Sequence, residues 1–379
     1  MRCEFDDVAL DSVITDIAAG PFGSNLKISC FVSSGFPIID GANLKGFKVT
    51  DNITKFVTKE KARSLSRSIA KRNDVVVTIS GTLGQIAYIP QDSKYAEYLC
   101  SQRQFRVSFD DKTVYVPYLV YYFHTYEGQN KILSFANQTG VPALSQPLKN
   151  FKQIRVKLPD IDTQKRIAHI IESLDNKIEL NNKINENLEQ QAQAFYQELF
   201  INHANPEWKQ GHLSDLIIVR YGKDHKKLAD GSVPVFGSGG LMRKVERPLY
   251  DKESVLIPRK GTLNNVMYIN EPFWSVDTMF YTEMKFPNIA KFVYHFLKSK
   301  DLASMNAGSA VPSMTTDILN TIEIRIPSRD VLATFENIVS PMYETMQHSI
   351  KESAKLATIR DSLLPKLMSG EIDVSELQF

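Results

Sequence analysis

Three charged residues in the second half of the chain have the order of a metal-dependent nuclease set. Asp277, Glu283 and Lys285 follow the pattern Asp, Glu-x-Lys, in which carboxylates hold a divalent metal ion that activates water. This spacing is frequent by chance, and no similar set occurs at the corresponding place in the first half. We therefore interpret the three residues as solvated surface charges.

A second segment comes close to a methyl-transfer motif. Residues 270–273, Asn-Glu-Pro-Phe, approach the Asn-Pro-Pro-aromatic pattern of amino-methyltransferases, but Glu271 replaces the first proline and no Gly-rich cofactor loop precedes it. The chain lacks a Gly-x-x-x-x-Gly-Lys-Ser/Thr phosphate loop, and its seven histidines do not pair with cysteines or carboxylates at metal-ligand spacing. We expect no catalytic centre, no metal site and no cofactor in this chain.

The elements around these segments occur twice, in the same order. The strongest match pairs Gly81-Thr82-Leu83 with Gly261-Thr262-Leu263, and each triplet is followed by a Tyr-Ile pair. Each single match is short, but chance does not explain their shared order, so the sequence predicts two similar modules. Further matches join residues 36–41 to 233–237, 140–144 to 310–314, and 154–159 to 322–327.

Within each module the local patterns are mixed. The β-rich runs 74–79 and 254–257, bounded by Gly and Pro, predict strands. The apolar stretches 118–123 and 290–297 predict short helices packed on a sheet. Gly81 and Gly261 are expected to shape turns rather than to contact a ligand.

A long helix is predicted after each module. Apolar residues recur with helical period from Ile167 to Leu199, after a start that Asp162 or Thr163 can cap. The pattern recurs from Phe335 to Leu367. Each helix of about 40 residues would be about 60 Å long. Because so narrow an apolar stripe needs a partner helix, the two helices are expected to form a coiled-coil spacer.

Two prolines lie in the second helical pattern and are expected to kink it or end a turn, namely Pro341 and Pro365. The alternative interpretation of both patterns is a pair of ordinary core helices in one domain. We prefer an α+β chain with two globular α/β modules, at residues 1–158 and 205–327. Two long antiparallel coiled-coil helices, at 159–204 and 328–379, separate them and complete a pseudo-twofold internal repeat.

Bulk composition narrows the class. The 45 basic and 43 acidic residues give a net charge of +2, so any nucleic-acid binding must come from local basic surfaces. The three cysteines have no disulfide or metal spacing, which indicates a reducing compartment. The acidic N-terminal segment does not resemble a signal peptide, and no apolar run approaches a membrane span. A cytoplasmic protein without membrane contact is expected.

This organisation resembles the specificity subunits of type I restriction-modification systems. Residues 20–27, Gly-Pro-Phe-Gly-Ser-Asn-Leu-Lys, look like the opening segment of that family's target recognition domains, and residues 233–241 look like its Pro, aromatic, Gly-Ser turn. Residues 158–168 are similar to its helix entry and residues 363–372 to its ending. The second helix departs from the pattern, because residues 327–331 lack the Gln-Lys/Arg pair.

The resemblance implies a non-catalytic DNA-recognition subunit. Each module would read one half of a split double-stranded DNA sequence, while the helices would set the gap and dock two modification subunits. Those partners would bind S-adenosylmethionine and methylate adenine, and restriction subunits would use ATP and Mg²⁺. The alternatives are a coiled-coil scaffold with two protein-binding domains, a type IIG-like specificity subunit, and a fused methyltransferase or nuclease.

The expected DNA contacts are basic, amide and hydroxyl side chains in loops. Arg and Lys can pair with guanine, and Asn or Gln with adenine, in the major groove. Contacts to phosphates add affinity without sequence information. In the first module the candidates are Ser24, Asn25, Lys27, Lys45, Thr82, Gln85, Arg103 and Gln138; in the second they are Lys223, Lys226, Ser238, Arg243, Lys244, Arg259, Lys260, Thr262 and Asn264.

Overall fold

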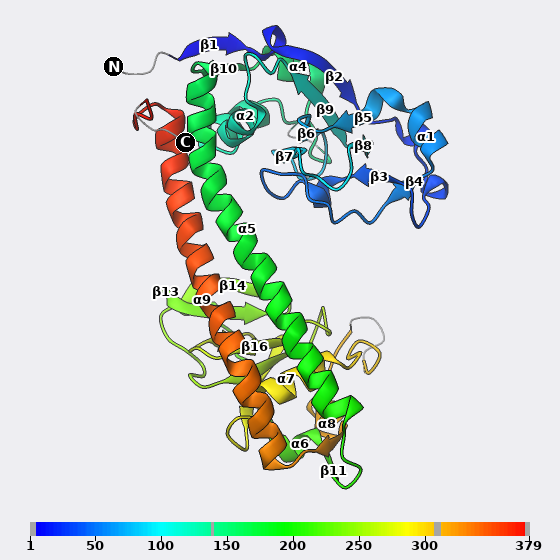
Figure 1. Cartoon of the computed structure of the whole chain (residues 1–379), viewed down its shortest axis with the longest axis vertical. Coiled ribbons are helices and arrows are strands. Elements are labelled where there is room, and N and C mark those ends of the chain that lie inside the picture. The colour runs from blue at the N-terminus through cyan, green and yellow to red at the C-terminus, as the bar shows by residue number, and fades with distance from the viewer. Residues whose placement is uncertain (1–4, 138–139, 307–311, 376–379) are drawn as a thin grey trace. The chain divides into compact units, whose positions relative to one another are not determined.

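A computed structural model describes residues 5–137, 140–306 and 312–375 (Figure 1). The chain divides into two compact units, Met1–Glu179 with Glu352–Phe379, and Leu180–Lys351. Each unit contains one module and part of each long helix, so the helices are shared between the units. Among the described residues, no helix is long and apolar enough to cross a membrane.

The first module contains two small sheets that share a core. The first sheet has the antiparallel order β2-β9-β6-β7, and the second has the order β4-β3-β8-β5, in which β3 and β8 run parallel. On β6, Val75 and Val77 pack into the cluster that contains helix α2 (Val116–Phe123), whereas Val76 packs against the second sheet. The alternation of strand side chains thus buries β6 on both faces. The strands are β2 (Ile14–Ala19), β3 (Phe36–Ile39), β4 (Phe56–Val57), β5 (Ile69–Lys71), β6 (Val75–Thr78), β7 (Ile86–Tyr88), β8 (Glu97–Cys100) and β9 (Gln104–Phe109).

The second module repeats this topology. Its sheets have the orders β12-β18-β15-β16 and β14-β13-β17, with β13 and β17 parallel. Only the equivalent of β5 is missing from the described strands. The predicted internal repeat is therefore confirmed at the level of strand order. The strands are β12 (Ile217–Tyr221), β13 (Asp230–Gly237), β14 (Gly240–Val245), β15 (Ser254–Pro258), β16 (Met267–Ile269), β17 (Trp274–Ser275) and β18 (Met279–Met284).

Short helices pack on the first sheet of each module. The predicted helices are confirmed as α2 (Val116–Phe123) and α7 (Ala290–Lys298), both of which are buried along their whole length except for Lys298. The remaining short helices are α1 (Lys59–Ser64), α3 (Tyr126–Leu133), α4 (Pro147–Gln153), α6 (Leu213–Leu216) and α8 (Thr316–Asn320).

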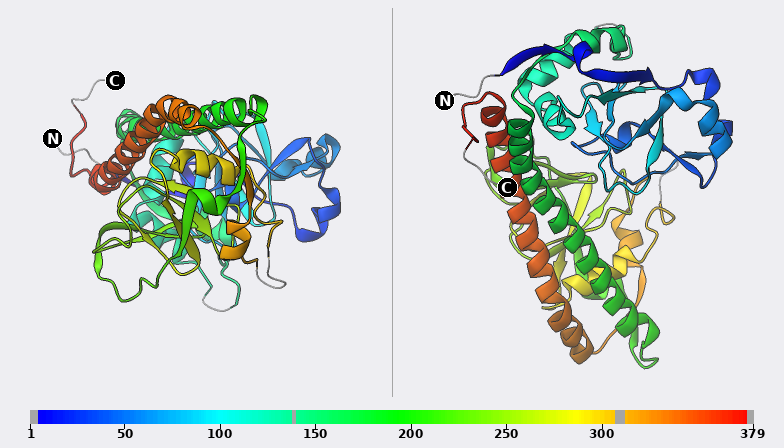
Figure 2. Two further views of the ribbon diagram at one scale, coloured as in Figure 1. Left: turned by 90° about the horizontal axis from the view of Figure 1, so that it is seen from below. Right: turned by 45° about the horizontal axis from the view of Figure 1, so that its top comes forward.

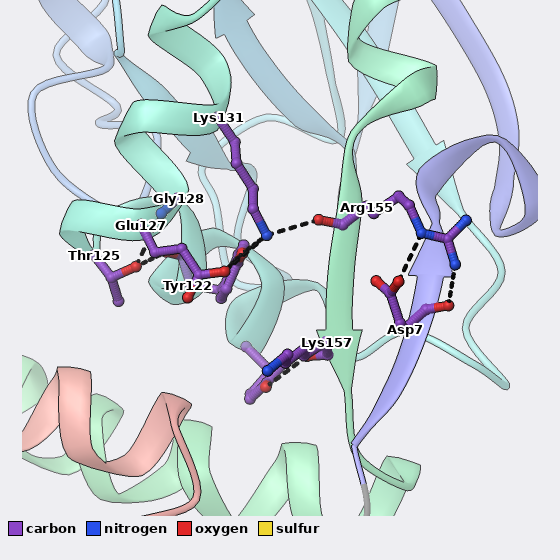
Figure 3. A network of polar contacts seen from close by, with 9 residues as sticks. Asp7, Tyr122, Thr125, Glu127, Gly128, Lys131, Arg155 and Lys157 are labelled. Carbon is purple, nitrogen blue, oxygen red and sulfur yellow. Dashed lines mark hydrogen bonds and ion pairs between the residues drawn. The ribbon is translucent and has the colours of Figure 1, made fainter.

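An antiparallel ribbon joins the first and last strands of each module. Strand β1 (Asp6–Ala9) pairs with β10 (Arg155–Leu158), and β11 (Lys209–His212) pairs with β19 (Glu323–Ile326). A polar network holds the first ribbon, as Figure 3 shows. Lys131 on α3 donates to the Arg155 carbonyl at 2.9 Å and to Glu127 at 2.8 Å, while the Arg155 guanidinium pairs with Asp7 at 2.7 Å. The strand that leads into the first long helix is thus fixed.

The first long helix, α5 (Ile161–Gln197), begins directly after this ribbon and ends in a π-helical turn, Glu198–Asn202. The expected caps Asp162 and Thr163 are wrong. Asp160 is the cap, because its carboxylate accepts hydrogen bonds from the backbone N–H groups of Asp162 and Thr163 at 3.1 and 2.9 Å. The helix therefore begins earlier than the apolar periodicity alone indicates.

The second long helix, α9 (Arg329–Met368), continues through Pro341 and Pro365. The sequence predicted that each proline would kink the helix or end a turn, and the helix ends at neither of them. Val339, Tyr343 and Met346 are buried around Pro341, and this packing maintains the helix despite the lost backbone hydrogen bond.

Within each unit, α5 and α9 lie side by side (Figure 2). In the first unit Asp175 pairs with Arg360 at 2.7 Å and Lys177 with Glu352 at 3.5 Å. In the second unit Asn181 donates to the Ser349 carbonyl at 3.4 Å. Partner numbers fall along α9 as they rise along α5, so the pair is antiparallel, as predicted.

The two helix starts differ in one buried residue. In the first unit Gln164, 1% exposed, donates to the carbonyls of Thr113 and Pro159 at 2.9 Å and accepts from the Tyr115 N–H at 2.9 Å. The residue five positions after the corresponding proline of the second unit is Leu332, which packs in the apolar core beside an open groove of about 550 Å³. The second helix lacks the Gln-Lys/Arg pair, so an apolar contact of Leu332 stands where the first helix has the hydrogen bonds of Gln164.

Candidate nucleic-acid interface

Five loops of the first module meet at one end of its two sheets. They follow β2 and β3, connect β6 to β7 and β8 to β9, and include the segment before α4. Backbone hydrogen bonds join them into one scaffold. These bonds run from Gly20 N to Gln104 O at 2.7 Å, Ser101 N to Ile39 O at 2.9 Å, Ile79 N to Arg103 O at 2.7 Å, and Leu144 N to Ile79 O at 2.8 Å.

The second module has the same loop scaffold. The bonds occur between the residues that the strand order makes equivalent, so the two ends are built alike. They run from Gly222 N to Met279 O at 3.0 Å, Val276 N to Phe236 O at 3.1 Å, Arg259 N to Thr278 O at 2.9 Å, and Met314 N to Arg259 O at 2.9 Å.

Two pairs of glycines make this scaffold possible. A Cβ atom on Gly20 would lie 1.8 Å from the Ser101 carbonyl oxygen, and one on Gly222 would lie 2.0 Å from the Val276 carbonyl oxygen. No side chain fits at either place. Gly81 and Gly261 have φ values of 95° and 86°, which confirms that they shape turns.

A groove of about 550 Å³ opens among the loops of the first module. Gln85 is held in its wall, because it accepts from Thr78 Oγ1 at 3.1 Å and donates to the Gly41 carbonyl at 3.0 Å. Burial raises the pKa of Asp40 at its edge, but the hydrogen bonds from Lys55 and the Ala42 N–H outweigh this, so the pKa is lowered and the carboxylate stays charged. Other lining residues include Leu26, Ile28, Phe31, Thr82, Gln102 and Arg103.

Several candidate side chains of the first module are free to bind. Within the described residues, the Arg103 guanidinium has no hydrogen bond or ion pair, and the same holds for the side chains of Ser24, Asn25 and Lys27 on the loop after β2. The structure brings Thr82, Gln85 and Arg103 together in the groove. Lys45 is exposed and does not line the groove, and Gln138 lies outside the described residues.

Part of the candidate set of the second module gathers at the equivalent end. Ser238 lies against the glycine turn, since a Cβ on Gly261 would be 2.9 Å from its Oγ. Arg259 donates to the Asp277 carbonyl at 3.1 Å and lies over the Tyr221 ring at 5.3 Å. The neighbouring Lys260 and Thr262 are exposed on the same turn.

The other candidates of the second module divide into engaged and exposed residues. Asn264 donates to Asp301 at 3.0 Å and accepts from the Ala303 N–H at 2.9 Å, so its amide maintains a loop. Arg243 donates to the Leu228 carbonyl at 2.8 Å and pairs with Asp230 at 2.9 Å. Three lysines are exposed, namely Lys223, Lys226 and Lys244.

Side chains of the two segments with possible catalytic chemistry form hydrogen bonds within the fold. Glu283 accepts two hydrogen bonds from Arg220, at 3.0 and 3.2 Å, and Lys285 donates to the Ser214 carbonyl at 2.6 Å. Asp277 precedes β18 whereas Lys285 follows it, so an extended strand separates them. Asn270 forms a reciprocal amide pair with Gln347. Among the described residues no cluster of His, Cys, Asp and Glu could hold a metal ion.

The exposed apolar residues beside these loops were not predicted from the sequence. Ile28 lines the groove of the first module, Phe22 is exposed on the same loop, and Tyr221 lies under Arg259 in the second module. Gln102 also lines the groove of the first module. An aromatic residue within the Gly- and Pro-containing run 20–23 was the signal available for Phe22, since such a run indicates a loop.

Comparisons with known proteins agree with this architecture. Residues 33–190 and 205–338 match the family described as type I restriction modification DNA specificity domain. The MjaIX specificity subunit of Methanocaldococcus jannaschii is 22% identical, over 98% of this chain and 94% of its own length. The HindI specificity subunit of Haemophilus influenzae is 23% identical, over 58% and 69%.

A solved structure has the same fold. The S subunit of a type I restriction-modification system from M. genitalium superimposes with a TM-score of 0.62 at 18% identity, covering 97% of this chain and 96% of that one. Two matches to one family in one chain account for the repeated sheets and loops described above. The chain therefore belongs to the type I restriction-modification DNA specificity family.

Proposed function

We propose that this chain is the DNA sequence-specificity subunit of a type I restriction-modification enzyme. Each module reads one half of a split DNA target, and the helix pair sets the gap between the halves. The observation that carries the proposal is the loop scaffold that occurs at the end of both modules with different side chains. Arg103 of the first module corresponds to Thr278 of the second, and Gln102 corresponds to Asp277. Unlike side chains on one scaffold suit two different half-sites.

The groove chemistry supports DNA as the ligand. A free guanidinium, amides and hydroxyls are the groups that read base edges, and Lys27 and Lys260 are available for phosphates. Because the net charge of the whole chain is only +2, the electrostatic attraction for DNA must come from these local basic surfaces.

The enzymatic steps belong to other subunits in this proposal. Two modification subunits carry S-adenosylmethionine and methylate adenine, and restriction subunits use ATP and Mg²⁺, while this chain holds no catalytic centre and no cofactor. The helices offer a docking surface, because they expose apolar side chains that a partner helix would cover. These are Leu180, Phe195, Ile350 and Ile359.

Genome-wide methylation tests the proposal. Cells that express this chain with its neighbouring modification subunit should acquire a split, asymmetric adenine-methylated motif, read by single-molecule sequencing, and deletion of this chain should abolish it. An unchanged methylome with an active modification subunit contradicts the proposal. It would favour the scaffold with two protein-binding domains, which should also lack the salt-dependent DNA binding that counterion release produces.

A further inference from the structure

The loop after β2 carries two apolar side chains that the fold leaves uncovered. Phe22 is 82% exposed and Ile28 is 85% exposed. Pro21 and Leu26, which lie beside and between them, are buried. The loop therefore anchors itself with two apolar residues and presents two others to solvent.

The loop is held in place at several points. The backbone N–H of Gly20 donates to the Gln104 carbonyl at 2.7 Å, and the backbone N–H of Asn25 donates to the Phe22 carbonyl at 2.8 Å in a 3₁₀ turn. A ligand that covers Phe22 would thus meet a preformed surface and would not have to order a flexible segment.

The same loop belongs to the wall of the groove. Ile28 lines the groove together with Gln102 and Arg103. A Cβ on Gly23 would lie 2.8 Å from Gln102 Oε1, so the loop rests directly on the turn between β8 and β9. Ile28 therefore lies beside the polar candidates, and Phe22 is presented by the same anchored loop.

The side chains between the two tips have complementary chemistry. Asn25 and Lys27 are exposed and have no side-chain partner among the described residues. In the major groove an asparagine amide pairs with N6 and N7 of adenine, and apolar side chains contact the 5-methyl group of thymine. Lys27 suits a phosphate. One loop thus carries the groups that recognise an A·T base pair and its backbone.

The second module does not repeat this chemistry at the equivalent loop. Gly222 is followed by Lys223 and Asp224, both exposed and charged. Of its exposed apolar residues, Leu241 and Met242 lie on β14, and Tyr221, which ends β12 just before this loop, lies under Arg259. The combination of apolar tips with an amide and a lysine on one loop is therefore particular to the first module.

We propose that Phe22 and Ile28 contact the 5-methyl groups of thymines in the half-site of the first module, while Asn25 binds the adenine of such a pair. This inference rests on the proposed function and adds the identity of bases to it. It makes the apolar tips specificity-determining, because cytosine and the deoxyuridine analogue both lack the methyl group.

Thymine replacement tests the inference on the full chain assembled with its modification subunit. Each thymine of the methylated motif is replaced in turn by deoxyuridine, which removes only the methyl group, and binding is measured by fluorescence anisotropy. At one thymine or more, the wild type should bind about four-fold more weakly, the loss expected for one buried methyl-sized group. The same replacement should not weaken binding by a Phe22→Ala/Ile28→Ala double variant.

A matched control uses Tyr126, which is 85% exposed in the same module and does not line the groove. Tyr126→Ala should retain the full deoxyuridine penalty, and circular dichroism melting should show all variants folded. The inference is overturned if the double variant retains the penalty or if no thymine responds. In either case the wild type would still prefer its motif over a scrambled duplex, whereas loss of that preference would overturn the proposed function itself.

Discussion

The amide of Gln164 bonds to the backbone N–H of Tyr115 at 2.9 Å and so ties the first turn of α5 to the loop before α2. The same amide donates to two carbonyls, so its oxygen and its nitrogen are both hydrogen-bonded. Leu332 stands at the equivalent place of the second unit and contributes only apolar contact. At this position hydrogen bonds join the first module to its helix, whereas apolar packing joins the second.

Replacement of Gln164 by leucine should destabilise the first unit. Three backbone groups would lose their partner, one of them in a buried and two in partly buried hydrogen bonds. Because one unsatisfied buried group costs about 1–3 kcal/mol, we expect the free energy of unfolding to fall by about 2 kcal/mol. Urea unfolding followed by circular dichroism measures the change. Gln190→Leu, an exposed position on the same helix, should change it by less than about 0.5 kcal/mol. Equal effects at the two positions would contradict the role of Gln164.

Removal of the Arg360 side chain should also destabilise the first unit. Arg360 pairs with Asp175 at 2.7 Å, and Asp175 also accepts from the Tyr121 hydroxyl at 3.2 Å. Because Arg360→Ala leaves a half-buried carboxylate without its cation, we expect a loss of about 3 kcal/mol in the free energy of unfolding. Asp361→Asn alters the exposed partner of the same arginine and should have little effect. A silent Arg360→Ala variant would show that the pair does not stabilise the helices.

Stability of the second unit should depend on the protonation of His295. Burial lowers the pKa of His295 from 6.5 to about 4, and the neutral ring bonds to Gln193 at 2.8 Å and to the Tyr343 hydroxyl at 2.9 Å. Since the folded pKa lies below the unfolded value, the unfolded chain binds the extra proton between these two values. The contribution is therefore present above pH 6.5 and is lost as pH falls toward 4.

The test compares the wild type with His295→Gln at several pH values. Between pH 7 and 5 the wild type should lose about 2 kcal/mol more than the variant. Burial also lowers the pKa of His124 in the first module, but that residue is present in both proteins and cancels in the comparison. Parallel stability curves for the two proteins would refute the assignment to His295.

Arg103 should read a base rather than support the fold. Its guanidinium has no partner among the described residues, so Arg103→Ala should leave the melting temperature unchanged. We expect affinity for the recognised duplex to fall about ten-fold and discrimination at one base pair to relax. Anisotropy against a panel of single-base variants measures both. Lys59→Ala, an exposed change on α1, serves as control, and unaltered discrimination by Arg103→Ala would exclude base reading.

The helix pair should set the spacing of the target. Insertion of one heptad after Glu179 and one before Glu352 lengthens both helices at the boundary between the units. One heptad adds about 10 Å of helix, and a base pair adds about 3.4 Å of DNA, so the spacer should grow by about three base pairs. The methylome of cells with this variant reports the spacer directly. An unchanged spacer would contradict the proposed measuring role.

Local sequence patterns were sufficient for part of this structure. The turns at Gly81 and Gly261 and the helices α2 and α7 follow from residue type and periodicity, and they are confirmed. The parallel pairing of β3 with β8 could not be predicted, because it joins segments far apart in the chain. The continuity of α9 through Pro341 depends on tertiary packing that overrides local propensity.

The sequence predicted the types of side chain at the candidate site, but not which individual residues belong to it. Residue type nominates Arg103 and Asn264 equally, yet only the structure shows that Asn264 is engaged by Asp301 and Ala303. Phe22 was missed for the opposite reason, since an aromatic residue is usually buried and its exposure depends on the anchoring of the loop. The role of each candidate on DNA stays a prediction.

The ribbons β1–β10 and β11–β19 have a consequence for how such a chain can change. The polypeptide enters and leaves each module through two paired strands, so each module is a cassette that joins the rest of the chain at one ribbon. A different module could replace it if its first and last strands formed the same ribbon and fitted the adjoining helix start. New DNA specificities could then arise by recombination of whole modules, without the gradual redesign of a binding surface.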